Sequence, residues 1–187
     1  MVTVMSLWLP VLVAAVAVFV ASSIIHMVLK YHNNNFKKVP DQDAVQEALR
    51  KFKLAPGEYM LPRCDHMKEM KDPAFVDKLN KGPVVLMTVL PSGQFNMGKS
   101  LGQWFVYCLV ASVFAAYITG RAVPAGGEYL HVFRFAGAVA FVGYSLALWQ
   151  DLIWHARPLS TVLKQTFDGL IYGLVTGGVF GAMWPSM

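Results

Sequence analysis

The chain has 187 residues, of which 56% are hydrophobic and only 14% are charged. Soluble globular domains carry about 25% charged residues, so this composition excludes an ordinary soluble domain and indicates an integral membrane protein. The formal net charge is +5, and most of the 16 Lys and Arg residues lie between residues 30 and 99.

Four stretches reach the roughly 20 apolar residues that a helix needs to cross a bilayer. They are residues 4–29, 101–120, 130–154 and 166–184. The first lacks the basic start and the short apolar run of a signal peptide, so we expect it to remain as a helix. Because backbone polar groups in lipid must be satisfied within the segment, each stretch is predicted to be helical. The predicted fold is therefore all-α: an antiparallel bundle of four transmembrane helices.

Between the first two spans lies a polar extension, residues 31–99, so the chain divides into residues 1–30, 31–99 and 100–187. Asp41 or Asp43 can cap a helix that runs through residue 52, and a second helix has Asp72 as N-cap, Pro73 in its first position and Gly82 just past its end. Residues 58–61 and 84–90 have the composition of short strands. We expect a small α+β extension with too little core to stand alone.

The basic residues predict the orientation of the bundle. Lys and Arg near the span ends gather on the side of the 31–99 extension, which the positive-inside rule assigns to the cytoplasm. Both termini then face the periplasm. We expect no nucleic-acid partner.

Small residues recur along the spans at helical spacing and predict helix packing. The last span carries a glycine at every fourth position, the pattern of a glycine zipper, and alanines form narrow faces on the second and third spans. The predicted packing positions are Gly169, Gly173, Gly177, Gly181, Ala111, Ala115, Ala136 and Ala140. All five tryptophans stand near span ends, where indole rings anchor helices at the membrane interface: Trp8, Trp104, Trp149, Trp154 and Trp184. The stripe can face sister helices or another chain.

The predicted topology brings polar residues from the inner ends of all four spans to one depth. These are His26, Lys99, Gln103, Asp151, His155, Lys164 and Asp168. Asp168 is the residue of most interest, since a carboxylate just inside a span is costly unless it is paired. Asp151 and His155 are one helical turn apart and can pair with each other. A structural ion-pair layer is the favoured interpretation, and a proton- or ion-handling site is the alternative.

Residues 93–100, GQFNMGKS, match the Walker A pattern in full. We reject a nucleotide site because the helix that follows is a membrane span and no doubly wound sheet can be completed. Instead, Asn96 or Ser100 is expected to cap the second span, with Lys99 reaching the headgroups.

Two further groups of residues, a possible soft-metal site and a possible disulfide, are not predicted to form. Cys64, His66, Met67 and Met70 offer soft-metal ligands, but their spacing fits no established pattern. Cys64 and Cys108 lie in such different settings that we expect no disulfide between them. We predict no catalytic set, no metal site and no cofactor.

Residues 96–100 with Gln103 and Trp104, and residues 166–172, resemble a group of small bacterial four-span membrane proteins that carry no assigned activity. The resemblance covers most of the chain. It implies a four-span architecture only, and no activity. We separately expect the protein to lie in the bacterial inner membrane.

These observations favour a non-enzymatic accessory or assembly subunit of a larger membrane complex, such as a respiratory or photosynthetic one. Its partners would be the lipid bilayer and other membrane subunits or copies of itself. The first alternative is a small homo-oligomeric transporter or channel with Asp168 near its entrance. The second is a lipid-modifying enzyme that uses Asp151, His155 and Lys99.

Overall fold

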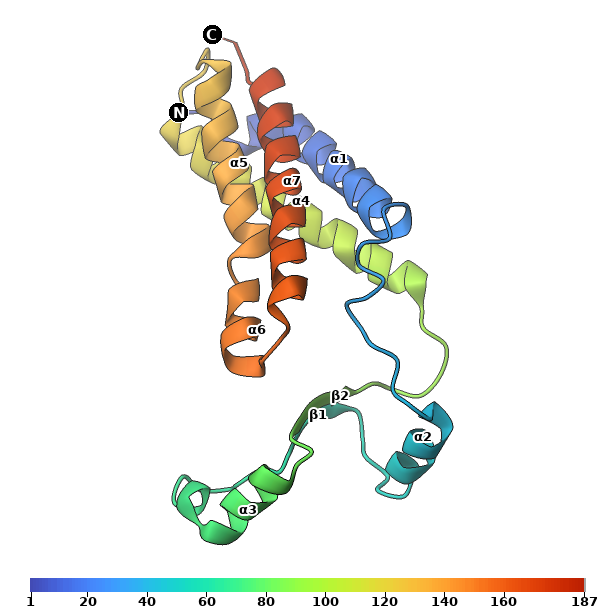
Figure 1. Ribbon diagram of the computed structural model, residues 1–187. Coiled ribbons are helices and arrows are strands. Elements are labelled where there is room, and N and C mark those ends of the chain that lie inside the picture. The colour runs from blue at the N-terminus through green and yellow to red at the C-terminus, as the bar shows by residue number, and fades with distance from the viewer. Residues whose placement is uncertain (187) are drawn as a thin grey trace. The chain divides into compact units, whose positions relative to one another are not determined.

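The computed structural model describes residues 1–186, which are mostly helical with one small two-stranded sheet (Figure 1). The chain forms two compact units, one from Met1–Phe36 together with Asn96–Met187 and the other from Lys37–Phe95. The predicted extension at 31–99 is thus shortened at both ends. At its start this is because residues 31–35 contact the last helix of the first unit.

The first unit is a helical bundle. After a 3₁₀ turn, η1, the long helices α1, α4, α5 and α7 run through it, and a short helix, α6, precedes the last of them. Their bounds are η1 Val4–Leu7, α1 Trp8–Met27, α4 Met97–Ala122, α5 Tyr129–Ser145, α6 Leu148–His155 and α7 Leu159–Ala182.

Three helical segments of the described residues 1–186 are long and apolar enough to cross a membrane: Val4–Met27, Met97–Ala122 and Tyr129–His155. They correspond to the first three predicted spans. Helix α7 is 24 residues long but is not among them. Lys164, Gln165 and Asp168 lower its mean hydropathy, and its glycines add little to it. The fourth span therefore remains a prediction.

The four predicted packing glycines of α7 lie against α5 of the same chain. A Cβ atom placed on Gly173 would lie 2.9 Å from the carbonyl oxygen of Gly137, and one on Gly177 would lie 2.7 Å from that of Phe133. At Gly181 the nearest atoms belong to the Tyr129 ring, also at 2.7 Å. Since real Cβ atoms do not approach neighbours so closely, only glycine permits this contact, and α5 and α7 form the most extensive helix pair in the chain.

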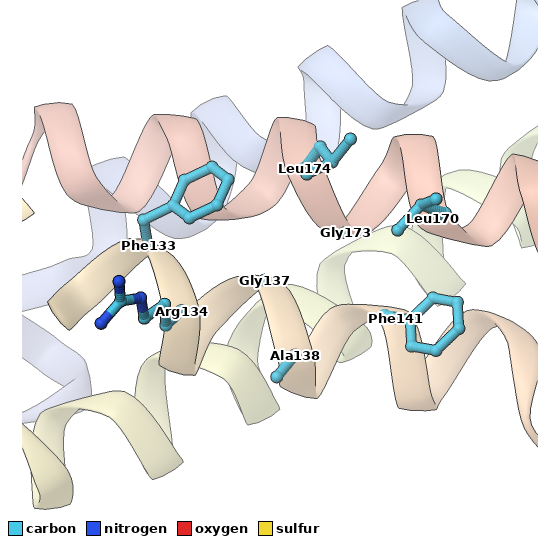
Figure 2. A pocket seen from close by; sticks show the side chains of 8 residues that line it. All are labelled: Phe133, Arg134, Gly137, Ala138, Phe141, Leu170, Gly173 and Leu174. Atoms are coloured by element: carbon cyan, nitrogen blue, oxygen red, sulfur yellow. The ribbon is translucent and has the colours of Figure 1, made fainter. Parts of the chain in front are cut away.

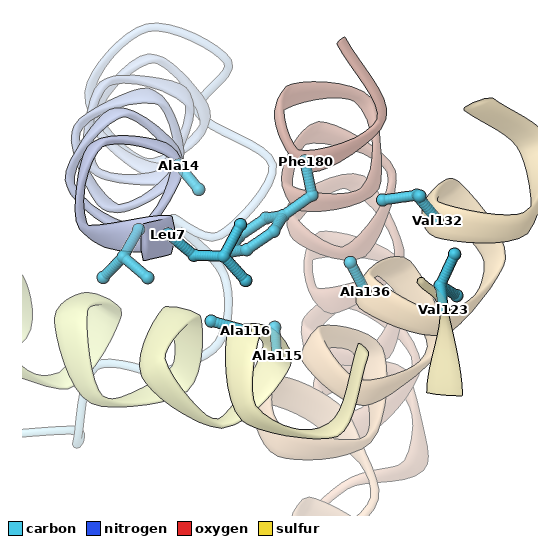
Figure 3. Packing of buried hydrophobic residues seen from close by; sticks show 9 residues of the cluster. Leu7, Ala14, Ala115, Ala116, Val123, Val132, Ala136 and Phe180 are labelled. Carbon is cyan, nitrogen blue, oxygen red and sulfur yellow. The ribbon is translucent and has the colours of Figure 1, made fainter. Parts of the chain in front are cut away.

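Alanines make a second close contact around one large side chain. Phe180 of α7 is fully buried, and Leu7, Ala14, Ala115 and Ala136 pack in the same cluster (Figure 3). These residues come from η1, α1, α4 and α5, so with Phe180 of α7 the cluster joins all four long helices of the bundle. A second cluster contains two further predicted packing positions. Ala140 is fully buried and Ala111 is half-buried.

The third predicted span, 130–154, is not one continuous helix. It is interrupted at Leu146 and Ala147, between α5 and α6. The hydroxyl of Tyr107 on α4 donates to the Gly143 carbonyl at 2.6 Å, so a side chain of another helix occupies an acceptor at the break. Helix α6 then begins with a hydrogen bond of the 3₁₀ type, which joins residues three apart: the Trp149 amide donates to the Leu146 carbonyl at 3.3 Å.

Both described chain ends lie at the same end of the bundle as the α4–α5 loop. The Val2 amide donates to the Gly120 carbonyl at 3.0 Å, and the Gly126 amide donates to the Pro185 carbonyl at 2.8 Å. The Trp184 indole also donates to the Pro124 carbonyl at 2.8 Å. Figure 1 shows the two termini close together beside this loop.

The second unit contains the elements expected for the extension. Helix α2, Gln42–Arg50, is capped by Asp41, and helix α3, Pro73–Lys81, is capped by Asp72 and ends at Gly82. Strands β1, Gly57–Leu61, and β2, Val85–Val89, pair antiparallel with Gly57 opposite Val89. No residue from 37 to 95 is buried, so this unit has secondary structure without a core.

Candidate functional site

Asp168 is the most deeply buried ionisable side chain of the predicted polar layer, with 3% of its surface exposed. It lies in the first half of α7, next to Gly169. There, the absence of a side chain lets Ser145 and Tyr144 of α5 approach closely. A carboxylate in such a place requires strong partners to offset its lost hydration.

Those partners come from the segment that leaves the first helix. The Tyr31 hydroxyl donates to Oδ1 of Asp168, and Nε2 of His32 lies 2.9 Å from Oδ2. The second contact has the distance of an ion pair but lacks hydrogen-bond geometry, since Nε2 of His32 is buried without a hydrogen-bond partner. His26, in the last turn of α1, stacks on His32 with ring centroids 4.4 Å apart.

Lys164, one turn before Asp168 on α7, holds the same segment in place. Its ammonium donates to the Tyr31 carbonyl at 2.7 Å and to the amide oxygens of Asn34 and Asn35. A nitrogen–nitrogen contact of 2.9 Å joins the Asn35 amide to Nδ1 of His32. The segment is thus tied to α7 through both a cation and a carboxylate, and the His32 ring is oriented from its far side.

Electrostatics keep the Tyr31 phenol in its protonated form. Burial raises the pKa of this phenol, and the hydrogen bond to Asp168 and the charge of that carboxylate raise it further. The hydroxyl therefore acts as a stable donor to the carboxylate.

Other members of the predicted layer lie elsewhere. Lys99 and Gln103 are exposed on the first turns of α4. Asp151 and His155 pair with each other on α6, with Nδ1 and Oδ1 3.0 Å apart, and Arg157 lies 3.7 Å from the other carboxylate oxygen. The layer therefore divides into a cluster around the buried Asp168, an ion pair on α6, and two exposed residues on α4 that belong to neither.

Sequence reasoning missed His32, Asn34 and Asn35 as members of the cluster. They lie just beyond the predicted first span, in a stretch that was assigned to the extension. The available signal was their density of polar side chains: residues 31–35 read Tyr-His-Asn-Asn-Asn directly after an apolar helix.

The five tryptophans differ in environment. Trp8 and Trp154 are exposed, as interface anchors would be, whereas Trp104, Trp149 and Trp184 are half-buried. The Trp104 indole donates to the Ser22 hydroxyl at 2.8 Å. This bond joins α4 to α1 inside the bundle, so Trp104 has an internal partner in addition to its position near a helix end.

The Walker-like segment begins helix α4. The Asn96 side chain accepts a hydrogen bond from the Lys99 amide at 3.0 Å, which is an N-cap. Gly93 lies in the other unit. The cap that we expected is therefore present, and the Asn96 side chain occupies an amide that a phosphate-binding loop would need free.

A hollow on the outer face of the α5–α7 pair is lined by carbon atoms (Figure 2). Gly137 and Gly173 line it together with the larger side chains Phe133, Phe141 and Leu174. Arg134 is its one charged residue, and the lining contains no nucleophile or general base. The hollow suits an alkyl chain or a neighbouring apolar side chain, and it does not suit a reaction centre.

Comparison with known proteins found no match to a family model, to a curated protein or to a solved structure.

Proposed function

We propose that this protein is a non-enzymatic accessory or assembly subunit of a larger complex in the bacterial inner membrane. In this proposal the four long helices span the bilayer, and residues 37–95 lie in the cytoplasm and bind another subunit. The observation that carries the proposal is the absence of any buried residue in this unit.

A chain of about 60 residues that folds by itself buries about 60% of the surface of its unfolded form. The unit 37–95 instead has no buried residue, and several of its apolar side chains lie mostly in solvent: Phe52 is 71% exposed, Leu61 54% and Leu90 67%. On α2, Val45 and Leu49 are 39% and 40% exposed. Exposed apolar faces on capped helices are the expected form of a surface that is completed by a partner.

The charges of α2 favour a protein partner over a lipid surface. Helices that lie on membranes carry Lys and Arg on the polar face. The polar face of α2 instead carries Asp43 and Glu47, and its single cation, Arg50, is paired with Glu47. Anionic headgroups would repel this face, which leaves a protein subunit as the expected occupant of the apolar face of α2.

The test is co-purification of tagged full-length protein from its native membranes in mild detergent. The double variant Val45→Lys/Leu49→Lys removes the apolar face of α2 and adds two positive charges. The matched control Asp43→Asn/Glu47→Gln changes the net charge equally on the opposite face. We expect the first variant to lose the co-purifying subunits and the control to retain at least half of them.

Two outcomes would contradict the proposal. One is wild-type protein that purifies without other subunits. The other is equal recovery of partners with both variants. Purification only as a homo-oligomer would favour the transporter interpretation instead.

A further inference from the structure

The cluster at the inner end of α1 has the composition of a metal site. Two imidazoles and a carboxylate, from His26, His32 and Asp168, place their candidate ligand atoms within 4.8 Å of one another. These residues belong to one compact unit, and Asp168 lies far along the sequence from the two histidines. Two histidines with one carboxylate are a common ligand set for Zn²⁺, with a fourth position left for water.

We propose that His26, His32 and Asp168 bind one divalent transition-metal ion of the zinc type. The inference does not depend on the accessory role proposed above. It rests on three features of the cluster: a buried carboxylate without a Lys or Arg partner, a buried ring nitrogen without a hydrogen bond, and a supporting shell of polar side chains.

The first feature is the charge of Asp168. This buried carboxylate has no Lys or Arg within ion-pair distance among the described residues 1–186, because the nearby Lys164 ammonium binds oxygens of residues 31, 34 and 35. A buried carboxylate must be paired or must coordinate a metal. A divalent ion supplies the missing positive charge.

The second feature is Nε2 of His32. It is buried, has no hydrogen-bond partner, and lies 2.9 Å from Oδ2 of Asp168. Two ligand atoms of a tetrahedral zinc ion are roughly 3.3 Å apart, since each metal–ligand bond is about 2.0–2.1 Å. The observed pair is close to this separation, so an ion can enter with a small widening.

The His26 ring completes the set from the surface. His26 is exposed, so its side chain can rotate toward the other two ligands without disturbing the core. Closing the 4.8 Å spread to the roughly 3.3 Å of a tetrahedral site requires a movement of about 1.5 Å, which a change in side-chain torsion supplies. The exposed side also gives the ion a path of entry.

The third feature is the outer shell. The Tyr31 hydroxyl donates to Oδ1 of Asp168, which leaves Oδ2 as the ligand atom. The Asn35 amide lies 2.9 Å from Nδ1 of His32. The oxygen of the same amide accepts a hydrogen bond from Lys164 at 3.3 Å, so Asn35 holds the imidazole in place from its far side. Metal-binding histidines and carboxylates have outer partners of this kind.

The bound ion would join the end of α1, the segment 31–36 and α7. It would therefore fix the point at which the chain leaves the bundle for the 37–95 unit.

The competing arrangement for the same side chains is an ion pair between protonated His32 and Asp168 without metal. It accounts for the 2.9 Å contact but gives no role to the His26 imidazole stacked on His32. The two arrangements differ in whether the purified protein binds a metal.

The experiment uses full-length protein purified in detergent, stripped with a chelator and titrated with Zn²⁺, with Co²⁺ as an optical probe. We expect one equivalent to bind and Co²⁺ to show the absorption of a tetrahedral site. His32→Ala and Asp168→Asn should each weaken binding more than ~100-fold, and Tyr31→Phe should weaken it ~10–100-fold.

The matched control is His155→Ala, which removes an imidazole from the exposed His–Asp pair on α6 and should leave binding unchanged. His26→Gln keeps the proposal testable if Asp168→Asn fails to fold, because His26 is exposed and the variant should fold normally while losing metal affinity. The proposal is overturned if the wild-type protein binds no metal, or if its affinity is unchanged in the ligand variants or falls in His155→Ala.

Discussion

Alanine substitution at two neighbouring glycines of α7 tests the packing of this helix on α5. A methyl group on Gly177 would lie 2.7 Å from the Phe133 carbonyl oxygen and 3.3 Å from the Gly137 Cα. Both are backbone atoms, so the helices must move apart. A methyl group on Gly178 would have only the Tyr129 hydroxyl near it, at 3.8 Å, which is an ordinary contact.

The pair of variants isolates the contact energy. Each variant gains about 0.5–1 kcal/mol of helix stability because alanine favours a helix more than glycine does. This gain cancels when the two variants are compared. Overpacking a close contact costs about 1–3 kcal/mol. We therefore expect Gly177→Ala to be less stable than Gly178→Ala by about 1–3 kcal/mol.

The assay is unfolding in one detergent, followed by the helical circular dichroism signal. Equal stability of the two variants, or a more stable Gly177→Ala, would refute the packing argument. The comparison requires no knowledge of the partner or of the ligand, so it tests the fold alone.

Two further predictions concern local contacts. Asn96→Ala removes the cap of α4 and should lower stability by about 1 kcal/mol, with faster hydrogen exchange at the Lys99 amide; Gln94→Ala is the control, and equal exchange in both would contradict the cap. The pKa of the Tyr31 phenol is raised in the folded protein. Its interactions therefore stabilise the fold fully when the pH is below the ordinary pKa of 10.0, and this stabilisation is lost as the pH rises through the higher pKa of the folded state. Tyr31→Phe should therefore reduce stability at pH 7, and its difference from wild type should narrow in strong alkali; a difference that grows there would exclude the proposed hydrogen bond to Asp168.

Local chemistry allowed the elements of the extension to be predicted. Asp72, Pro73 and Gly82 specify the two ends of α3 through the cap, the fixed φ of proline and the tolerance of glycine for positive φ. Asp41 begins α2 in the same way. These signals act within a few residues, so no tertiary information was needed to find them.

The break in the third span could not be predicted in this manner. The helix is interrupted at Leu146 and Ala147, and both of these residues are apolar. The Gly143 carbonyl is satisfied by Tyr107, a residue of another helix. Hydropathy reports whether a segment suits lipid, but it does not report an acceptor that a neighbouring helix supplies.

The sequence predicted the end of the bundle at which polar residues gather, but it did not predict which of them lie together. Span boundaries place His26, Lys164 and Asp168 at one end of the bundle, and the structure brings them into one cluster. Lys99 and Asp151 have a similar predicted depth and lie apart from it, because depth alone does not say which helices are neighbours. The return of residues 31–35 onto α7 depends on tertiary contacts with Lys164 and Asp168, which hydropathy does not encode.

The accessory role is tested most directly by the native mass of the particle that contains this chain, extracted from its own membranes in mild detergent. The account predicts a particle that contains other membrane subunits in fixed ratio to this chain. A particle that contains this chain alone, as a monomer or as a whole-number multiple of its mass, would contradict it.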